Sequence, residues 1–181
     1  MQNKRFQEIY LDEAVKKLQD YFKYKNIHQV PKIEKVVLNV SVSDAVSNSK
    51  AIDLAARDIS LISGQKPLIT KAKKSIAAFK LRQGMKIGCK VTLRGSRMYD
   101  FLERLIYTAL PRIKDFKGFS IKNFDGSGNL NFGIKEQSVF SELKYDEIVS
   151  INGLNVSIVT NSKKNEESKL LLSLLKFPFV A

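Results

Sequence analysis

The sequence predicts an α+β fold in which an antiparallel sheet has helices packed on one face. Segments that alternate apolar and polar residues, as strands do, take turns with segments whose apolar residues recur every three or four positions, as in helices. Their order is β-α-β-β-α-β, flanked by a helix at each end. The chain of 181 residues is 44% hydrophobic, so it can bury the core of one domain.

The N-terminal segment predicts a helix over residues 5–24. We expect the helix to end before Val30, because Pro31 moves the preceding residue away from helical geometry. The apolar residues of this helix fall at spacings of three and four: Phe6, Ile9, Tyr10, Ala14, Leu18, Tyr21 and Phe22.

Residues 33–42 predict the first strand of a core that spans residues 32–110. The alternation puts four residues on one face, Val36, Leu38, Val40 and Val42, and four on the other, Lys35, Val37, Asn39 and Ser41. A second helix follows the polar stretch 43–49. Its apolar residues run from Ile52 to Ile62, and Gly64 is placed to end it.

A short strand over residues 67–72, an exposed loop over 73–84 and a longer strand over 85–94 are predicted next. The longer strand turns Ile87, Cys89, Val91 and Leu93 inward and Lys86, Gly88, Lys90, Thr92 and Arg94 outward. A third helix is expected to begin with Ser96 as its N-cap and to stop at Pro111.

The C-terminal part, residues 111–181, is expected to hold loops, one strand and one helix within the same single domain, 1–181. Asp125–Asn129 predicts a turn, residues 154–160 predict a strand, and a helix begins at about Asn165 and stops before Phe177. Five aromatic residues are expected to anchor the loops: Phe116, Phe119, Phe124, Phe132 and Phe140.

The charge of the chain is concentrated in one window. Between Asp58 and Asp100 no acidic residue occurs, and this window holds ten basic residues: Lys66, Lys71, Lys73, Lys74, Lys80, Arg82, Lys86, Lys90, Arg94 and Arg97. The whole chain has 31 basic and 18 acidic residues, so removing the ten leaves 21 basic against 18 acidic. Because solvated faces normally mix signs, this patch predicts an anionic partner.

Nucleic acid is favoured over lipid as that partner. No apolar run approaches the ~20 residues that a membrane span needs, and the basic residues cross strands and a loop rather than one amphipathic helix. The sheet face away from the helices would collect Asn39, Ser41, Lys90, Thr92, Arg94, Asn155 and Ser157. Such side chains form hydrogen bonds with a ribose-phosphate backbone and neutralise its charge, so this face is expected to bind RNA. With the β-α-β-β-α-β order, the core is therefore expected to be RRM-like.

Signals for catalysis are weak. His28 is the only histidine and is expected to have a structural or surface role. Cys89, the only cysteine, is expected to be a core residue, since no activating base is indicated, and its lack of a partner favours a reducing compartment. The turn at Asp125–Asn129 lacks the spaced carboxylates of a Ca²⁺ loop. We therefore expect no enzyme activity, no metal and no cofactor.

The loop between the second and third strands has two interpretations. It is either a flexible hairpin or a segment that inserts along an RNA backbone, since Lys73, Lys74, Lys80 and Arg82 surround Phe79. Phe79 in turn either packs within the protein or stacks on a base.

Several strings in order along the chain resemble the bacterial-type large-subunit ribosomal protein five family, the universal 5S-rRNA-binding protein of the central protuberance. These are QVPKIEK (29–35), SGQKP (63–67), TKAKKS (70–75), GCKVTLRG (88–95), PRIKDF (111–116), NFDG (123–126) and FPF (177–179). The resemblance covers nearly the whole chain, and members of this family are not enzymes.

The resemblance implies a structural constituent of the large subunit. It would bind 5S rRNA and large-subunit rRNA beside a neighbouring 5S-rRNA-binding ribosomal protein. Positions that match the family's RNA-recognition residues are Asn39, Gln65 and Thr92. We add three cations of the basic window to this candidate site: Lys71, Lys90 and Arg94.

Two further contacts are implied. Residues 73–85 match the loop that faces P-site tRNA, with Lys73, Lys74, Phe79, Lys80 and Arg82 as its candidate residues. Residues 112–133 match the side that meets a small-subunit head protein at an intersubunit bridge, with Arg112, Lys114 and Lys117 as candidates.

Two other classes stay open: a non-ribosomal RNA chaperone or architectural nucleic-acid-binding protein, and an enzyme acting on RNA. Abundant Asn, Lys, Ile and Ser indicate an AT-rich genome, and the resemblance around residues 25–29 leans towards plastids. We expect a ribosome of the bacterial cytoplasm or of an organelle interior, with the plastid stroma favoured.

Overall fold

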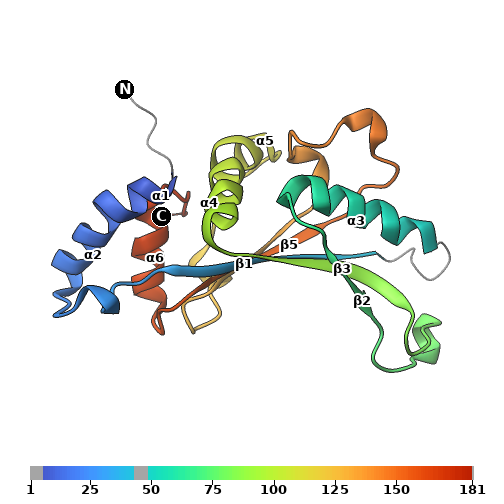
Figure 1. Cartoon of the computed structure of the whole chain (residues 1–181), viewed down its shortest axis with the longest axis horizontal. Helices are drawn as coiled ribbons and strands as arrows, with labels where there is room; N and C mark the ends of the chain where they lie inside the picture. Colours follow the sequence, from blue (N-terminus) through green and yellow to red (C-terminus); the bar gives the residue numbers. More distant parts are fainter. Residues whose placement is uncertain (1–5, 43–48, 181) are drawn as a thin grey trace. The chain divides into compact units, whose positions relative to one another are not determined.

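The computed structural model describes residues 6–42 and 49–180, and it confirms the α+β class. Among these residues the sheet has five antiparallel strands in the order β2-β3-β1-β5-β4 (Figure 1). In chain order the strands are β1 (Ile33–Ser41), β2 (Leu68–Lys71), β3 (Lys86–Leu93), β4 (Leu130–Ile134) and β5 (Leu154–Thr160). The polar stretch expected over residues 43–49 lies almost wholly outside the described residues.

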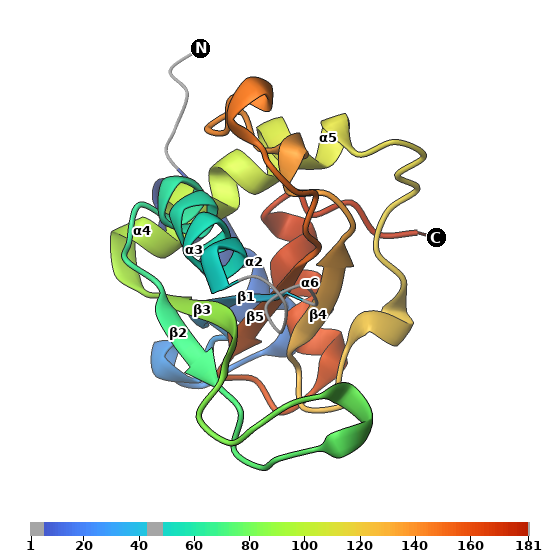
Figure 2. The same cartoon turned by 90° about the vertical axis from the view of Figure 1, so that its right-hand side faces the viewer.

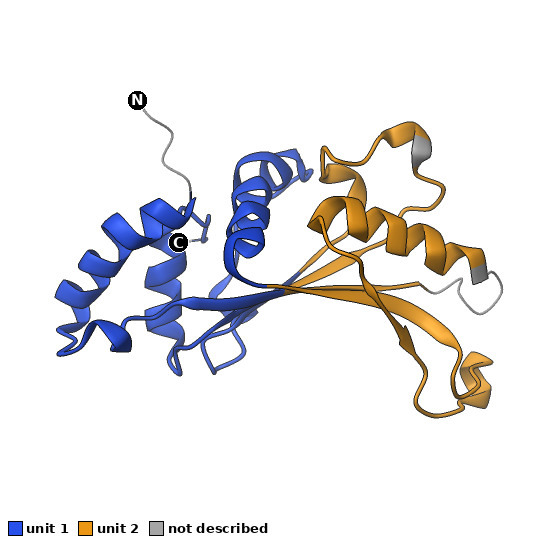
Figure 3. Ribbon diagram, viewed as in Figure 1, with its two compact units in different colours: residues 1–36, 94–132, 157–181 blue, residues 37–93, 133–156 orange. Residues whose placement is uncertain are grey.

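The chain divides into two compact units, each built from segments that are distant in the sequence (Figure 3). Unit 1 comprises residues 1–36, 94–132 and 157–181, and unit 2 comprises residues 37–93 and 133–156. Strands β1, β4 and β5 each run through both units. That the whole chain acts as a single domain stays a prediction.

Unit 2 packs helix α3 (Ser49–Ser63) against β3. Figure 1 shows α3 over one face of the sheet in unit 2. It is the only α-helix in the described part of this unit. Side chains at most 3% exposed fill the space between them: Leu38, Val40, Ile52, Ala55, Ile59, Cys89, Val91 and Leu93. These side chains confirm the apolar stripe of the second helix and the expected alternation of β1 and of β3 from Cys89 onward. At the start of β3 the expected alternation is wrong: Ile87 is only half-buried, Gly88 is buried, and Lys86 pairs with Asp53 of α3.

Strands β2 and β3 form an antiparallel hairpin, which is closed by residues 72–85 (Figure 2). Leu68 stands opposite Lys90, and Thr70 stands opposite Gly88. The register shifts after Thr70, which is the signature of a β-bulge. Short helical turns also occur in unit 2, among them η4 (Ala77–Phe79) in the hairpin loop and η7 (Gln137–Val139).

The N-terminal helix of unit 1 is present but interrupted. It consists of α1 (Phe6–Ile9), the π-helical segment η1 (Tyr10–Ala14) and α2 (Val15–Phe22). Its buried residues recur every four positions: Phe6, Tyr10, Ala14 and Leu18. The placement of Tyr21 on the apolar stripe is therefore wrong, since it is 70% exposed. The wider π turn rotates the stripe, so that Phe22, which is half-buried, continues it.

The third helix departs from expectation at both ends. The chain stays extended through Arg94, which is the N-cap, and α4 (Gly95–Arg104) begins before Ser96, so Ser96 is not the cap. At the other end Pro111 does not stop the helix, which continues through the π-helical η5 (Leu105–Ala109) into α5 (Leu110–Arg112). A π turn that ends at Ala109, two residues before Pro111, fits a residue that cannot donate a backbone hydrogen bond.

Strand β4 was not expected from the sequence, and it gives the sheet a fifth strand. Beside it in unit 1, the expected turn at Asp125–Asn129 is confirmed: the Asp125 carboxylate accepts hydrogen bonds from the backbone N–H of Ser127 (2.9 Å) and of Asn129 (3.1 Å). The Asn129 side chain donates to the same carboxylate over 2.7 Å. This side-chain bond, followed by the backbone bonds, lowers the pKa of Asp125.

Aromatic rings anchor the C-terminal part of unit 1, as expected. Phe119 is 4% exposed, and its ring centroid lies 4.4 Å from that of Phe132 and 5.2 Å from that of Phe116. Val180 pairs with the same segment, because its backbone N–H donates to the carbonyl of Phe119 over 3.0 Å. The last helix, α6 (Asn165–Leu174), stops before Phe177 as expected.

Candidate nucleic-acid interface

The sheet face of unit 2 opposite α3, here called the open face, carries residues that alternation was expected to place there, whereas Arg94 and Ser157 of the same expected set belong to unit 1. Asn39 on β1 and Thr92 on β3 are half-buried, and Lys90 on β3 is exposed. Strands β1 and β3 are neighbours in the sheet. The open face therefore brings an amide, a hydroxyl and an ammonium group within one small area that no α-helix of the described part of unit 2 covers.

Gln65 joins this area although it lies outside the strands. Its side-chain Nε2 donates a hydrogen bond to the backbone carbonyl of Thr92 over 3.4 Å. Ser63 at the end of α3 fixes the segment locally: its hydroxyl donates to the carbonyl of Ile59 (2.7 Å) and accepts from the N–H of Gln65 (3.2 Å). The structure thus brings together two of the three residues singled out by the resemblance, Gln65 and Thr92.

Gly88 lets β3 and β1 approach closely beside this area. A Cβ atom on Gly88 would stand 2.3 Å from the carbonyl oxygen of Val40 and 3.4 Å from the hydroxyl of Thr70. The backbone N–H of Val42 also donates to the carbonyl of Ile87 over 3.1 Å. Thr70 therefore belongs to the open face, and alternation within the predicted strand 67–72 is the signal that finds it.

All ten basic residues of the acid-free window are exposed. Lys71 stands opposite Lys86 across the hairpin, and two like charges in this position cost stability unless an anion neutralises them. The repulsion is reduced at Lys86, because its ammonium lies 3.9 Å from the carboxylate of Asp53 on α3. Eight of the ten lie in unit 2, whereas Arg94 and Arg97 lie in unit 1. There the Arg94 guanidinium donates to the carbonyl of Glu34 over 3.4 Å.

The loop expected over residues 73–85 is exposed and is held by its own hydrogen bonds. Ile76 and Leu81 exchange two backbone bonds, of 3.0 and 3.1 Å, across the tip. The Ser75 hydroxyl accepts from the N–H of Gln83 over 2.9 Å. Between these bonds, Lys80 takes a left-handed conformation (φ 53°) that ends the short turn η4. These bonds fix the backbone conformation at the tip of the hairpin loop.

The four cations of this tip and its aromatic residue point outward. Lys73, Lys74, Lys80 and Arg82 are all exposed, and Phe79 is 68% exposed. The alternative that Phe79 packs within the protein is therefore wrong. The candidate bridge residues Arg112, Lys114 and Lys117 are likewise exposed, in unit 1.

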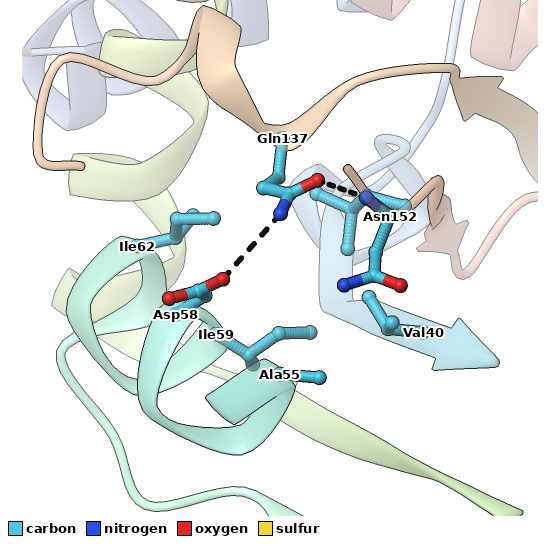
Figure 4. A pocket seen from close by; sticks show the side chains of 8 residues that line it. Val40, Ala55, Asp58, Ile59, Ile62, Gln137 and Asn152 are labelled. Carbon is cyan, nitrogen blue, oxygen red and sulfur yellow. Dashed lines mark hydrogen bonds between the residues drawn. The ribbon is translucent and has the colours of Figure 1, made fainter. Parts of the chain in front are cut away.

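Figure 4 shows a buried amide that the sequence did not indicate. Gln137 is 3% exposed, and its Nε2 donates to the Ser150 carbonyl (2.7 Å) and to the Asp58 carboxylate (3.4 Å). Its Oε1 accepts from the backbone N–H of Asn152. The adjoining cavity is only about 10 Å³, which holds about one water molecule at most. Gln137 thus ties loop 137–152 to α3 and forms no binding pocket.

The groups considered for catalysis show no shared site. Cys89 is fully buried, as expected, and burial, followed by the charge of Asp58, raises the pKa of its thiol to about 11. His28 is exposed in the turn η2 (Ile27–Gln29). The described residues contain no group of His, Cys, Asp or Glu that is arranged to hold a metal ion. In the same residues, no helix has the length and apolarity that crossing a membrane requires.

Comparison with known protein families gives two matches that together cover most of the chain. Residues 26–82 match the family model described as Ribosomal protein L5. Residues 86–179 match the model that describes the C-terminus of the same ribosomal protein family. The first match contains Asn39 and Gln65, and the second contains Thr92, so the candidate interface draws on both.

Proposed function

Because the chain belongs to the ribosomal L5 family, whose members are structural, RNA-binding proteins of the large ribosomal subunit and not enzymes, we propose that it binds 5S rRNA through the open face of unit 2. The observation that carries this proposal is the Gln65–Thr92 contact beside Lys90 on a face that no α-helix of the described part of unit 2 covers. In this role the protein helps attach 5S rRNA to the central protuberance, next to large-subunit rRNA and a neighbouring 5S-rRNA-binding protein.

Each candidate residue has a distinct role in this proposal. Asn39 and Thr92 are half-buried and so present short polar groups at a fixed height, which suits hydrogen bonds to sugar and phosphate oxygens. Lys90 is exposed on the open face and neutralises phosphates. Lys71, which stands opposite Lys86 and alternates to the α3 side of the sheet, adds exposed positive charge at the edge strand. Arg94 belongs to unit 1 and adds a cation directly after β3.

The sedimentation of the native protein tests this proposal. The protein should travel with large subunits and remain with 5S rRNA when these subunits are partly dismantled. A protein that sediments apart from ribosomal particles and prefers duplex DNA to 5S rRNA would instead be an architectural nucleic-acid binder.

The proposal assigns the hairpin tip, residues 73–85, to P-site tRNA. Its four exposed cations support this role, since long-range attraction to phosphate needs exposed charge. Neutralising Lys73, Lys74 and Arg82 to Gln, and Lys80 to Asn because Asn tolerates the left-handed conformation, keeps the backbone of the tip. The subunits should then retain the protein and lose P-site tRNA. If they lose the protein instead, the loop serves assembly.

A last part of the proposal concerns unit 1. Its exposed Arg112, Lys114 and Lys117 would face a small-subunit head protein at an intersubunit bridge. Changing all three to Ser should weaken the association of the two subunits and leave 5S rRNA binding unchanged. The ribosome concerned is bacterial or organellar, with the plastid stroma favoured by residues 25–29.

A further inference from the structure

Phe79 differs from every other phenylalanine of the chain. All eleven lie within the described residues, and the other ten are buried or half-buried, whereas Phe79 is 68% exposed. Within the described part of the chain its ring makes no contact with another ring or with a cation. An exposed aromatic ring does not gain the stabilisation that burial gives the other ten phenylalanine rings. Its exposure is therefore better explained by contact with a binding partner than by folding.

The backbone around Phe79 is already ordered by hydrogen bonds. Its turn is closed by the N–H of Lys80, which donates to the carbonyl of Ala77 over 3.0 Å, and by the Ile76–Leu81 pair directly outside it. At the base of the loop the N–H of Ala72 donates to the carbonyl of Met85 over 2.8 Å. The backbone of such a tip loses little conformational freedom on binding, so more of the contact energy appears as affinity.

The surroundings of Phe79 define the chemistry of its partner. Lys80 follows it directly, Lys73, Lys74 and Arg82 lie in the same loop, and the nearest acidic residues in sequence are Asp58 and Asp100. An aromatic ring among cations is the combination that binds unpaired nucleotides: the ring stacks on a base, and the cations neutralise its phosphates. A hydrophobic protein partner would not require four cations, and a duplex would offer no free base face.

We propose that Phe79 is a base-stacking residue that binds an unpaired base of tRNA. This inference rests on the proposed contact between the hairpin tip and P-site tRNA, and it adds the group that is recognised. The four cations then supply salt-dependent attraction, and the ring supplies the contact that slows release.

The first experiment compares large subunits reconstituted with full-length variants at position 79. Phe79→Ala should speed P-site tRNA release by about fivefold or more, the lower end of base–aromatic stacking. Phe79→Tyr and Phe79→Trp should release tRNA at the wild-type rate, because they keep a flat ring. Phe79→Leu, which keeps apolar bulk without a ring, should resemble Phe79→Ala. If Leu instead restores the wild-type rate, the residue makes an apolar contact and the stacking proposal is overturned.

The neutralised-tip variant separates the two proposals. If it loses tRNA while Phe79→Ala binds normally, the stacking inference fails and the tip still contacts tRNA. If neither variant changes tRNA binding, the contact between tip and tRNA fails as well. Ile76→Ala is a matched control, since Ile76 is 44% exposed on the same tip and carries no ring.

A second experiment uses the absence of tryptophan from the chain. The full-length Phe79→Trp variant has a single tryptophan, which can be excited selectively over the six tyrosines. Saturating tRNA at low salt should quench the tryptophan emission through stacking. The same amount of 5S rRNA should leave it unchanged, because that RNA is assigned to the open face. Tyr21→Trp is the control, since Tyr21 is 70% exposed in unit 1. Unchanged emission of Trp at position 79 under saturating tRNA would overturn the proposal, as would equal quenching by 5S rRNA.

Discussion

The side-chain amide of Gln65 donates a hydrogen bond to the backbone carbonyl of Thr92, 3.4 Å away. The two residues are separated by an entire hairpin in the sequence, yet the contact holds the segment after α3 against the end of β3. The amide oxygen of Gln65 and the hydroxyl of Thr92 are not used by this bond. The contact therefore positions two hydrogen-bonding groups at the edge of the open face.

Replacing Gln65 tests whether this positioning serves RNA. Gln65→Ala should weaken 5S rRNA binding by about 1 kcal/mol and hardly change thermal stability, because the lost bond is long and partly exposed. Gln65→Glu should weaken binding further, since it puts a negative charge near phosphates. Filter binding and thermal melting measure the two effects. A large loss of stability with unchanged RNA affinity would make Gln65 a purely structural residue.

Gly88 should tolerate no side chain. In Gly88→Ala the new methyl group would meet the backbone carbonyl of Val40 at 2.3 Å, and backbone cannot move aside cheaply. We expect a loss of about 1–3 kcal/mol in the free energy of unfolding, measured by urea denaturation. Lys90→Ala, on the same strand and face, is the control and should unfold like the wild type. Equal stability of both variants would show that β1 and β3 separate easily.

Asp58 should make stability depend on pH. Burial raises the pKa of Asp58 in the folded chain, and the hydrogen bond from the Gln137 side chain and the charge of Arg57 offset this rise only in part. The unfolded chain ionises this carboxyl at lower pH, so folding becomes less favourable as the pH rises from about 4 through the folded-state pKa. Asp58→Asn removes this dependence. Its stability relative to the wild type should therefore be higher at pH 7 than at pH 4, and the opposite trend would contradict the assignment.

Cys89 should report unfolding. The thiol is fully buried, and its pKa is raised to about 11, so little thiolate forms at neutral pH. A thiol reagent should label the native chain far more slowly than the chain in urea. Fast labelling of the native chain would mean that β3 opens readily from α3.

Sequence patterns predicted the elements whose periodicity is regular. The alternation in β1 and β3 was sufficient to assign Val40 and Cys89 to the core and Asn39 and Thr92 to the open face. Strand β4 was missed because it has only five residues, follows a turn-rich segment and contains Gly133, which weakens a strand pattern. The π turns were missed because their cause is the packing of the helix, which local spacing does not contain.

The candidate interface was predictable in its charge and only partly in its geometry. The acid-free window shows directly that this stretch of the chain is positively charged, because the charge of a Lys or Arg side chain does not depend on the fold. The pairing of Gln65 with Thr92 depends on where α3 ends relative to β3, which cannot be predicted from the residues next to either one in the sequence. The same holds for Gln137, whose burial follows from the path of loop 137–152.

RNA binding by the open face is tested most directly by the equilibrium affinity of 5S rRNA for the full chain with Asn39→Ala and Thr92→Ala combined. Each lost hydrogen bond should weaken binding by about 1–3 kcal/mol, while the salt dependence should stay that of the wild type, because no cation is removed. Thr108→Ala, a half-buried threonine in unit 1, is the control and should bind normally. Wild-type affinity in the double variant would show that the open face is not part of the RNA interface.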